Sequence, residues 1–237
     1  MANKMTKHTS YYQGARPEVA PFLPDNYSRV LEIGCGNGAF RQLMTDNCEY
    51  WGVEPVEAAA QEADQRLDKV LHNTFDEAYA QLPNHYFDLV ICNDVIEHLP
   101  DHEQFFRKIR EKMAPGGQII GSVPNVRYYK NLFALLVTKD WRYTAKGILD
   151  STHLRFFTKK SLLRSFRANG FQAERLQFIN SAVYLKRKYC TSALKTTANI
   201  VKFAFRFSGF LLFDIVTLGH SADIKYAQIG FRFRLEN

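Results

Sequence analysis

Residues 30–38 read Val-Leu-Glu-Ile-Gly-Cys-Gly-Asn-Gly, and this stretch decides the fold. Residues 30–33 are a mostly apolar run with β-branched members, which is typical of a buried strand. Glycines follow at the alternate positions 34, 36 and 38, and a segment compatible with a helix begins at Ala39. Glycine allows a sharp turn and lets a ligand lie directly on the main chain. The pattern predicts a strand, a ligand-binding loop and a helix.

Three interpretations of this loop compete. Gly34, Gly36 and Ala39 fit the dinucleotide pattern G-x-G-x-x-G/A, although that match alone is weak. The full form of residues 32–38, Glu-x-Gly-x-Gly-x-Gly, is better explained by an adenosine-containing ligand without a pyrophosphate. Glu54 follows Gly34 by 20 residues and can accept hydrogen bonds from ribose hydroxyls. The third interpretation is a purely structural turn, with Glu54 an ordinary loop acid. A nicotinamide oxidoreductase is disfavoured, since the chain has room for one nucleotide-binding half only.

Three further segments follow the glycine loop. Residues 50–55, Tyr-Trp-Gly-Val-Glu-Pro, predict a second strand that ends in an acid. Residues 87–99, Phe-Asp-Leu-Val-Ile-Cys-Asn-Asp-Val-Ile-Glu-His-Leu, predict a buried strand that runs into a polar turn. Residues 115–117, Pro-Gly-Gly, predict a loop before a strand at 118–123.

In these motifs and their order, over roughly residues 11–180, the chain resembles the class I S-adenosylmethionine-dependent methyltransferases. The resemblance implies an α/β fold: a Rossmann-like, seven-stranded, mostly parallel sheet with helices on both faces and an antiparallel last strand. It implies S-adenosyl-L-methionine as cofactor. The implied cofactor contacts are Glu32, Gly34, Cys35, Gly36, Gly38, Glu54, Pro55, Asn73, Asn93, Asp94 and Val95.

Residues 147–158, Gly-Ile-Leu-Asp-Ser-Thr-His-Leu-Arg-Phe-Phe-Thr, narrow the resemblance. They are similar to a branch with the signature Thr-His-Leu-Arg-Phe-Phe-Thr, and Arg16-Pro17-Glu18 fits the same branch. Many members resemble sugar or polysaccharide methyltransferases, and ubiquinone-pathway O-methyltransferases are more distant relatives. The resemblance is specific for the cofactor and much less specific for the acceptor.

The remaining pattern predicts one domain. Residues 1–26 form an N-terminal arm, residues 27–180 the cofactor-binding core and acceptor cap, and residues 181–237 a basic amphipathic segment and the last strand. Strands are predicted at 50–53, 69–71, 87–92, 118–123, 171–178 and 226–233, and helices at 58–67, 101–113 and from a cap at Thr158 to Gly170. Strands that alternate with helices indicate a mostly parallel sheet covered on both faces.

Composition agrees with a globular protein. The 237 residues are 46% hydrophobic, enough for one sizeable core. The four cysteines, Cys35, Cys48, Cys92 and Cys190, lack the paired spacing of a zinc site or a disulfide framework, so we expect no metal. Without an apolar signal-peptide core near the N-terminus, we expect a reducing, cytoplasmic location.

The net charge of +7 is unevenly placed. No acidic residue lies between Glu174 and Asp214, an interval with seven basic residues and several phenylalanines. Residues 190–216 can form an amphipathic element that holds the enzyme at the inner face of an anionic membrane. The alternative is a helix packed on the domain or on a second copy in a homodimer. Nucleic acid is disfavoured because the phenylalanines are too dense.

Methyl transfer to a hydroxyl requires in-line positioning and benefits from a base that removes the proton. His98 and His153 are the candidate bases, and each can instead be structural: His98 by ordering the site, His153 by pinning the cap. Arg155 can bind an anionic acceptor group or belong to that buried network. Tyr11 or Tyr12 can close over the sulfonium or be ordinary arm contacts.

Three functions follow from these observations. The first is methylation of a hydroxyl on a sugar, glycan or lipid-linked saccharide. The second is methylation of a quinone-like or other lipid-soluble small molecule. The third is a non-catalytic binding module, against which the intact glycine loop with Glu32 and Glu54 argues.

Overall fold

The computed structural model describes residues 14–181 and 222–236. The N-terminal residues Tyr11 and Tyr12 and the basic segment 190–216 therefore lie outside the described residues. The strands are β1 (Arg29–Ile33), β2 (Glu49–Val53), β3 (Lys69–Leu71), β4 (Phe87–Asn93), β5 (Met113–Pro124), β6 (Phe171–Ser181) and β7 (Tyr226–Leu235).

The helices connect these strands. The α-helices are α1 (Glu57–Ala63), α2 (Phe75–Ala78), α3 (His102–Lys112), α4 (Tyr129–Phe133) and α5 (Lys159–Ala168). The short 3-10 helices are η2 (Ala20–Phe22), η3 (Ala39–Leu43), η4 (Tyr79–Gln81), η5 (Ile96–His98) and η7 (Ala222–Lys225), and the π-helical turn is η6 (Ala134–Thr138).

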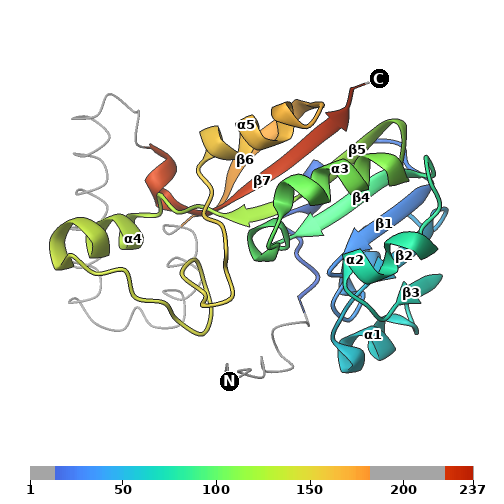
Figure 1. Cartoon of the computed structure of the whole chain (residues 1–237), viewed down its shortest axis with the longest axis horizontal. Helices are drawn as coiled ribbons and strands as arrows, with labels where there is room; N and C mark the ends of the chain where they lie inside the picture. The colour runs from blue at the N-terminus through green and yellow to red at the C-terminus, as the bar shows by residue number, and fades with distance from the viewer. Residues whose placement is uncertain (1–13, 182–221, 237) are drawn as a thin grey trace, which may run out of the picture.

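All seven strands form one sheet in the order β3-β2-β1-β4-β5-β7-β6 (Figure 1). Strands β1 to β5 pair in parallel, and β7 runs antiparallel to both β5 and β6. The predicted Rossmann-like sheet with an antiparallel last strand is confirmed. Because β1 lies between β2 and β4, the strand order reverses at β1, and ligands bind at such a point at the carboxyl ends of the strands.

Alternating residues of the strands fill two separate cores. Leu31 of β1 and Val90 of β4 face a phenylalanine-rich layer that includes Phe106 of α3 and Phe166 of α5. Val30, Leu89, Ile91 and Ile120 face the opposite layer, where they are packed with residues of η2, η3 and α1. With both faces buried, the strands can be apolar almost throughout, which explains the runs seen in the sequence.

Side-chain caps fix where two predicted helices begin. The Thr158 hydroxyl accepts the Ser161 amide at 3.1 Å, as predicted for the start of α5. Asp101 accepts the Gln104 amide at 2.9 Å and starts α3. Each cap satisfies an amide that has no partner within its helix.

Two predicted boundaries differ from the structure. Residues 115–117 are a bulge inside β5 and not a loop before it, because Phe87 pairs with Met113 whereas Leu89 pairs with Gln118. The helix predicted over 58–67 ends at Ala63. There the chain turns, with the Leu67 amide bonded to the Ala63 carbonyl, so that it can enter β3 beside β2.

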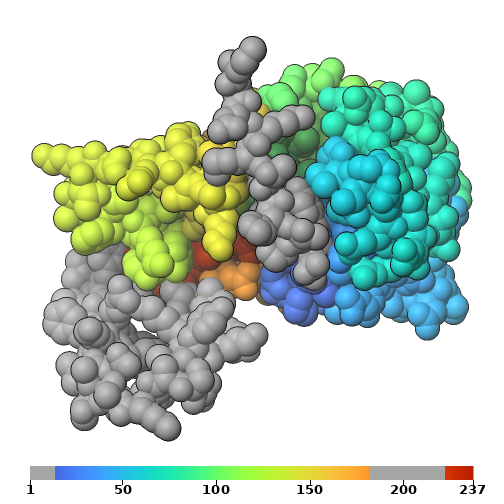
Figure 2. Space-filling model, turned by 90° about the horizontal axis from the view of Figure 1, so that it is seen from below, coloured from blue at the N-terminus to red at the C-terminus, as the bar shows by residue number. Residues whose placement is uncertain are grey.

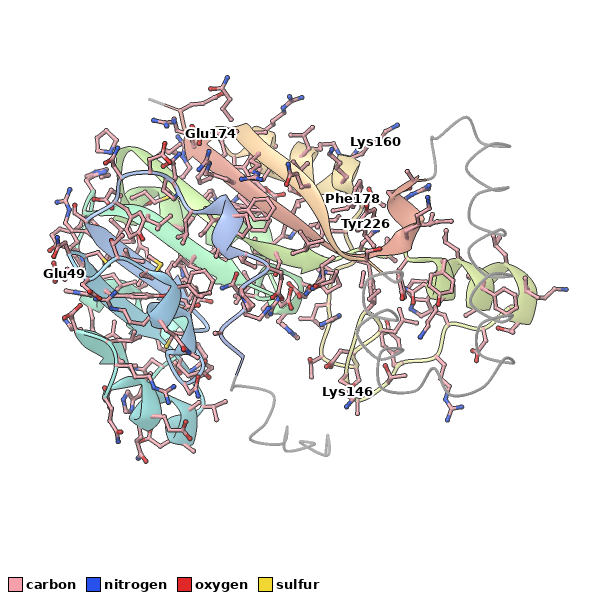
Figure 3. The ribbon with its side chains drawn as sticks, turned by 180° about the vertical axis from the view of Figure 1, so that it is seen from behind. Glu49, Lys146, Lys160, Glu174, Phe178 and Tyr226 are labelled. Carbon is pink, nitrogen blue, oxygen red and sulfur yellow. The ribbon has the colours of Figure 1, made fainter. Side chains whose placement is uncertain are left out.

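Residues 125–158 connect β5 to α5 and form a lobe, in yellow-green in Figure 2, that includes α4 and η6. Figure 3 shows Lys146 in a loop of this lobe, and Phe178 and Tyr226 where β6 and β7 lie together, with ring centroids 5.8 Å apart. Within the described residues, no helix is long and apolar enough to cross a bilayer.

Gly230 provides a test of how β7 packs. A Cβ atom at this position would overlap the ring of Phe22, which is 1% exposed. We therefore expect Gly230→Ala to lower the free energy of unfolding by roughly 1–3 kcal/mol in urea denaturation.

Gly14→Ala is the matched control, because its Cβ would make an ordinary contact 3.8 Å from Arg16. Adding Phe22→Leu to Gly230→Ala should recover part of the loss, since the two residues are in contact. Equal stability of Gly230→Ala and the native chain would contradict this packing.

Candidate active site

A cavity of about 660 Å³ lies at the carboxyl ends of β1, β2 and β4. Its volume is in the range of small-molecule and cofactor sites. Most of the predicted site residues line it: Glu32, Gly34, Cys35, Gly36, Glu54, Pro55, Asn93, Asp94, Val95 and His98. The structure therefore gathers these residues where the strand order reverses.

The glycine loop has the backbone geometry that only glycine adopts readily. Gly34, Gly36 and Gly38 have φ angles of 67°, 54° and 74°. A Cβ on Gly34 would also lie 2.9 Å from a methyl carbon of Val95, so the space itself excludes a side chain. Gly38 does not line the cavity: it lies against Ala63 of α1.

Glu54 is held in place by the glycine loop. One carboxylate oxygen accepts the Gly36 amide at 2.9 Å and the other accepts the Val56 amide at 2.9 Å. Burial raises the pKa of Glu54, and these two hydrogen bonds act in the opposite direction. Each oxygen has a second lone pair, which suits the predicted role as acceptor for ribose hydroxyls.

Glu32 is a second buried carboxyl group in the cavity wall. It accepts the Tyr50 hydroxyl at 2.6 Å and the Asn93 side-chain amide at 3.4 Å. Burial raises its pKa to about 8, and the hydrogen bonds from Tyr50 and Asn93 limit that rise. The Oδ1 atom of Asn93 is buried and has no hydrogen-bond partner among the described residues. A ligand with a positive charge and N–H donors fits these groups.

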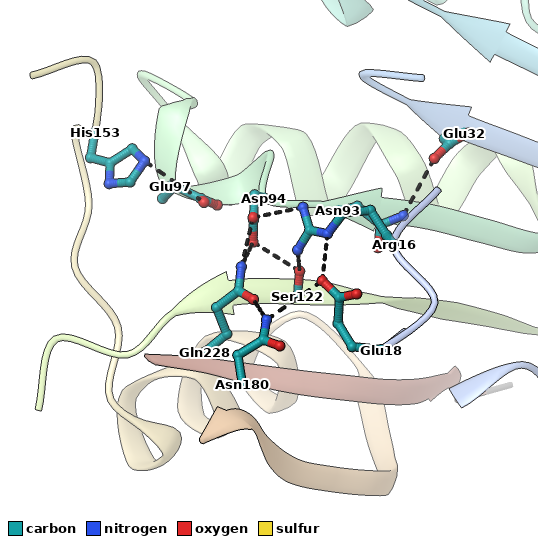
Figure 4. Close-up of polar contacts among 10 residues, drawn as sticks. All are labelled: Arg16, Glu18, Glu32, Asn93, Asp94, Glu97, Ser122, His153, Asn180 and Gln228. Atoms are coloured by element: carbon teal, nitrogen blue, oxygen red, sulfur yellow. Dashed lines mark hydrogen bonds and ion pairs between the residues drawn. The ribbon is translucent and has the colours of Figure 1, made fainter. Parts of the chain in front are cut away.

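Arg16 joins the segment before β1 to the end of β4 (Figure 4). Its guanidinium donates to Asp94 at 2.8 Å and to the Ser122 hydroxyl at 2.9 Å, and Gln228 donates to Asp94 at 2.7 Å. Burial would lower the pKa of Arg16, but the carboxylates of Asp94 and Glu18 outweigh it and hold the pKa above its ordinary value. The cavity wall is thereby tied to β5 and β7.

The two candidate bases lie against each other, with ring centroids 4.6 Å apart. His98 lines the cavity, and its Nδ1 lies 3.1 Å from the Thr152 carbonyl oxygen. His153 is buried outside the lining, and its Nδ1 lies 2.9 Å from the Ile148 carbonyl oxygen. Of the two, only His98 faces the cavity.

Arg155 and Asn73 are two further predicted contacts that lie outside the cavity lining. Arg155 donates to the Pro100 carbonyl at 2.7 Å, which holds the lobe against the segment after η5. A contact of this kind suits a structural role for Arg155 in a polar network that pins the cap. Binding of an anionic acceptor group by Arg155 stays a prediction. Asn73 is also outside the lining, whereas the next three residues, Thr74, Phe75 and Asp76, are part of it.

Sequence reasoning missed several lining residues. Arg16 was noted only as part of a signature, since nothing local indicates a partner 78 residues away. Ile33 and Val53, the last residues of β1 and β2, also line the cavity. The remaining lining residues come from loops and helices that the fold brings to the cavity: Gly14, Phe40, Val56, Thr74, Phe75, Asp76, Leu99, Pro100, Asp101, Gln104, Phe105 and Thr152.

Comparison with known proteins shows similarity to methyltransferases in both sequence and structure. A family model described as a methyltransferase domain matches residues 6–176. The ubiquinone biosynthesis O-methyltransferase of Aromatoleum aromaticum is 29% identical over 158 residues, which are 62% of this chain and 65% of that protein. That of Vibrio cholerae (strain O395) is 29% identical over 153 residues, 62% of each chain. The match thus spans less than two-thirds of these relatives.

Solved structures show the same fold. A SAM-dependent methyltransferase from Archaeoglobus fulgidus aligns with a TM-score of 0.63 at 17% identity, covering 98% of this chain and 96% of that one. Phosphoethanolamine N-methyltransferase 2 of Haemonchus contortus, solved in complex with S-adenosyl-L-methionine, aligns with a TM-score of 0.56 at 16% identity, covering 94% and 52%.

The raised pKa of Glu32 predicts how S-adenosylmethionine binding depends on pH. A bound cation favours the ionised carboxylate, so affinity should rise with pH as Glu32 loses its proton. Between about pH 6 and about pH 8 we expect roughly a tenfold increase, measured by calorimetry.

Glu32→Gln is the matched variant, because glutamine keeps the shape but cannot ionise. The amino group of the ligand titrates equally in both proteins, so the difference between the two pH profiles isolates Glu32. Identical profiles would show that Glu32 does not sense the bound cation.

Proposed function

This chain belongs to the class I S-adenosylmethionine-dependent methyltransferase domains, and we propose that it methylates a hydroxyl of a sugar, glycan or lipid-linked saccharide. The cavity carries this proposal, since a glycine loop, a buried acid at the end of β2 and a cavity-facing histidine meet in it. The choice of a saccharide rests on the resemblance of residues 147–158 to the sugar-associated branch.

The residues present fit the cofactor. Glu54 is available to ribose hydroxyls, and Glu32 and the unpaired Asn93 Oδ1 suit a cationic group with N–H donors. When bound, S-adenosylmethionine supplies an electrophilic methyl group. The chain itself holds the reactants in line and excludes water, and such positioning contributes much of the rate of a two-substrate reaction.

His98 is the better placed of the two candidate bases. The Nδ1 atom lies 3.1 Å from both the carbonyl oxygen and the hydroxyl oxygen of Thr152, and that hydroxyl donates its proton to Asp150. Both oxygens can therefore only accept here, so Nδ1 carries the proton in the neutral ring. The Nε2 atom is then the basic nitrogen that can take a hydroxyl proton near neutral pH. His153 does not line the cavity, and its ring lies against that of His98, which does.

A quinone-like or other lipid-soluble acceptor is the second candidate. It is favoured by the curated relatives, which are named ubiquinone biosynthesis O-methyltransferases. Transfer of labelled methyl groups into sugar nucleotides, extracted glycolipids and quinone precursors separates the two. Label in the saccharide fractions supports our proposal, and label confined to the quinone precursors would replace it with the alternative.

His98→Ala tests the catalytic assignment once an acceptor is known. We expect near-normal binding of S-adenosylhomocysteine and a loss of about 10²–10⁴-fold in turnover, because the variant lacks the proton acceptor. His72→Ala is the control, since His72 pairs with Asp64 and Glu57 away from the cavity lining. Full turnover of His98→Ala would show that positioning alone drives the transfer.

A further inference from the structure

We propose that Arg16 is a positioning residue for methyl transfer, because it holds Asp94 in the backbone conformation that shapes the cofactor cavity. The two residues belong to a closed ring of polar side chains, which we call the Asp94 ring (Figure 4). Its members are Arg16 and Glu18 before β1, Asp94 directly after β4, Asn180 in β6 and Gln228 in β7. The inference concerns cofactor binding, so it rests on the methyltransferase activity and holds for either acceptor of the proposed function.

Hydrogen bonds connect the five members around the ring. Arg16 donates to Asp94 and to Glu18, each at 2.8 Å. Gln228 donates to Asp94 at 2.7 Å, and Asn180 donates to the side-chain oxygen of Gln228. The Asn180 side-chain nitrogen also lies 3.5 Å from the Glu18 carboxylate, which closes the ring. The ring therefore joins four segments of the chain at the wall of the cavity, which Arg16 and Asp94 line.

The Asp94 carboxylate is fully occupied by donors of the protein itself. Its Oδ1 atom accepts the Ser122 hydroxyl at 2.8 Å and the Gln228 amide at 2.9 Å. Its Oδ2 atom accepts Arg16 at 2.8 Å and the Gln228 amide at 2.7 Å. An ionised carboxylate offers about four accepting sites, so these contacts leave none for a ligand. Asp94 therefore shapes the cavity through its backbone and not by accepting a hydrogen bond from the cofactor.

Asp94 has a left-handed backbone conformation, with a φ angle of 53°. Arg16 and Asn180 have φ angles of 54° and 58°, so the ring contains three of the five non-glycine residues with positive φ in the described part of the chain. This conformation is costly for a residue with a side chain, and it persists where surrounding contacts hold it. The ring provides these contacts for Asp94, together with the Asp94 amide, which donates to the Ser122 carbonyl at 2.9 Å.

The conformation of Asp94 decides how its two neighbours face the cofactor. Asn93 donates to Glu32 at 3.4 Å, and a methyl carbon of Val95 lies 2.9 Å from the place where Gly34 would carry a Cβ. Both neighbours line the cavity. A different φ at Asp94 would turn Asn93 and Val95 relative to each other. The ring therefore keeps the end of β4 in the shape that meets the glycine loop.

Arginine suits this position better than lysine. Nε of Arg16 donates to Glu18 and Nη1 donates to Asp94, whereas Nη2 donates to the Ser122 hydroxyl at 2.9 Å. A lysine has one nitrogen on a flexible stem, so Arg16→Lys keeps the charge but loses this geometry. The ring thus gives a use to the Arg16-Pro17-Glu18 segment of the sequence, since both of its charged members belong to the ring.

Two substitutions of Asp94 separate the backbone from the carboxylate. Asp94→Gly and Asp94→Ala both remove the carboxylate, but only glycine adopts a left-handed conformation without strain. Calorimetry with S-adenosylhomocysteine, well below the unfolding temperature of each variant, should show about tenfold tighter binding by Asp94→Gly than by Asp94→Ala. A purely structural ring would change thermal unfolding and leave the two affinities equal, so equal affinities would overturn the proposal.

Arg16→Gln tests whether the ring holds Asp94. It should weaken S-adenosylhomocysteine binding by about tenfold in the native chain, and by less than about threefold when Asp94→Gly is already present. Arg16→Lys should behave like Arg16→Gln. Arg127→Gln is the matched control and should bind like the native chain, since Arg127 pairs with Asp223 outside the cavity lining. Native-like binding by Arg16→Gln, or an equal loss with and without Asp94→Gly, would contradict the positioning role.

A crystal structure of the native chain with S-adenosylhomocysteine adds a measurement that needs no variant. Asp94 should keep its left-handed φ and its contacts to Arg16 and Gln228, with no ligand nitrogen or oxygen within about 3.5 Å of its carboxylate. A ligand hydrogen bond to that carboxylate, or an ordinary φ at Asp94, would overturn the proposal. The labelled methyl-transfer assay follows the acceptor separately, so the choice of acceptor and this proposal can fail independently.

Discussion

The hydrogen bond from the Gly36 amide to the buried Glu54 carboxylate is the contact on which the site depends. It joins the loop after β1 to the end of β2, so the two strands present their carboxyl ends as one wall. The loop reaches Glu54 only because its glycines adopt positive φ angles, and Val95 leaves no room for a side chain at Gly34. Since β1 lies at the reversal of the strand order, this wall stands where an open parallel sheet leaves a crevice.

The segment after β4 links the cofactor cavity to the lobe. Ile96 is fully buried in the core, the Glu97 carbonyl accepts the amides of Leu154 and Arg155, and His98 faces the cavity. Three consecutive residues therefore connect the core, the lobe and the site. The sheet determines how the cofactor lies, whereas the lobe can vary without disturbing the strands. This division explains why the cofactor follows from family membership, while the acceptor must be found by experiment.

Local patterns predicted the strands, the glycine loop and the Thr158 cap because these depend on neighbouring residues. Val30 and Leu31 point to opposite cores, and their apolar character identified β1 before any tertiary contact was known. The bulge at residues 115–117 escaped prediction, since Pro-Gly-Gly is equally typical of a loop. The pairing of Arg16 with Asp94 was not predicted either, because it depends on how segments far apart in the sequence come together in the fold.

A crystal structure with bound S-adenosylhomocysteine tests the central claim most directly, namely that the wall formed by the glycine loop and Glu54 holds the cofactor. We predict that the adenosine lies over Gly34 and Gly36 and that the ribose hydroxyls donate to the Glu54 carboxylate at about 2.5–3.0 Å. The amino acid part should reach Asn93 and Glu32. Density for the ligand in another cavity, or a ribose turned away from Glu54, would contradict the account.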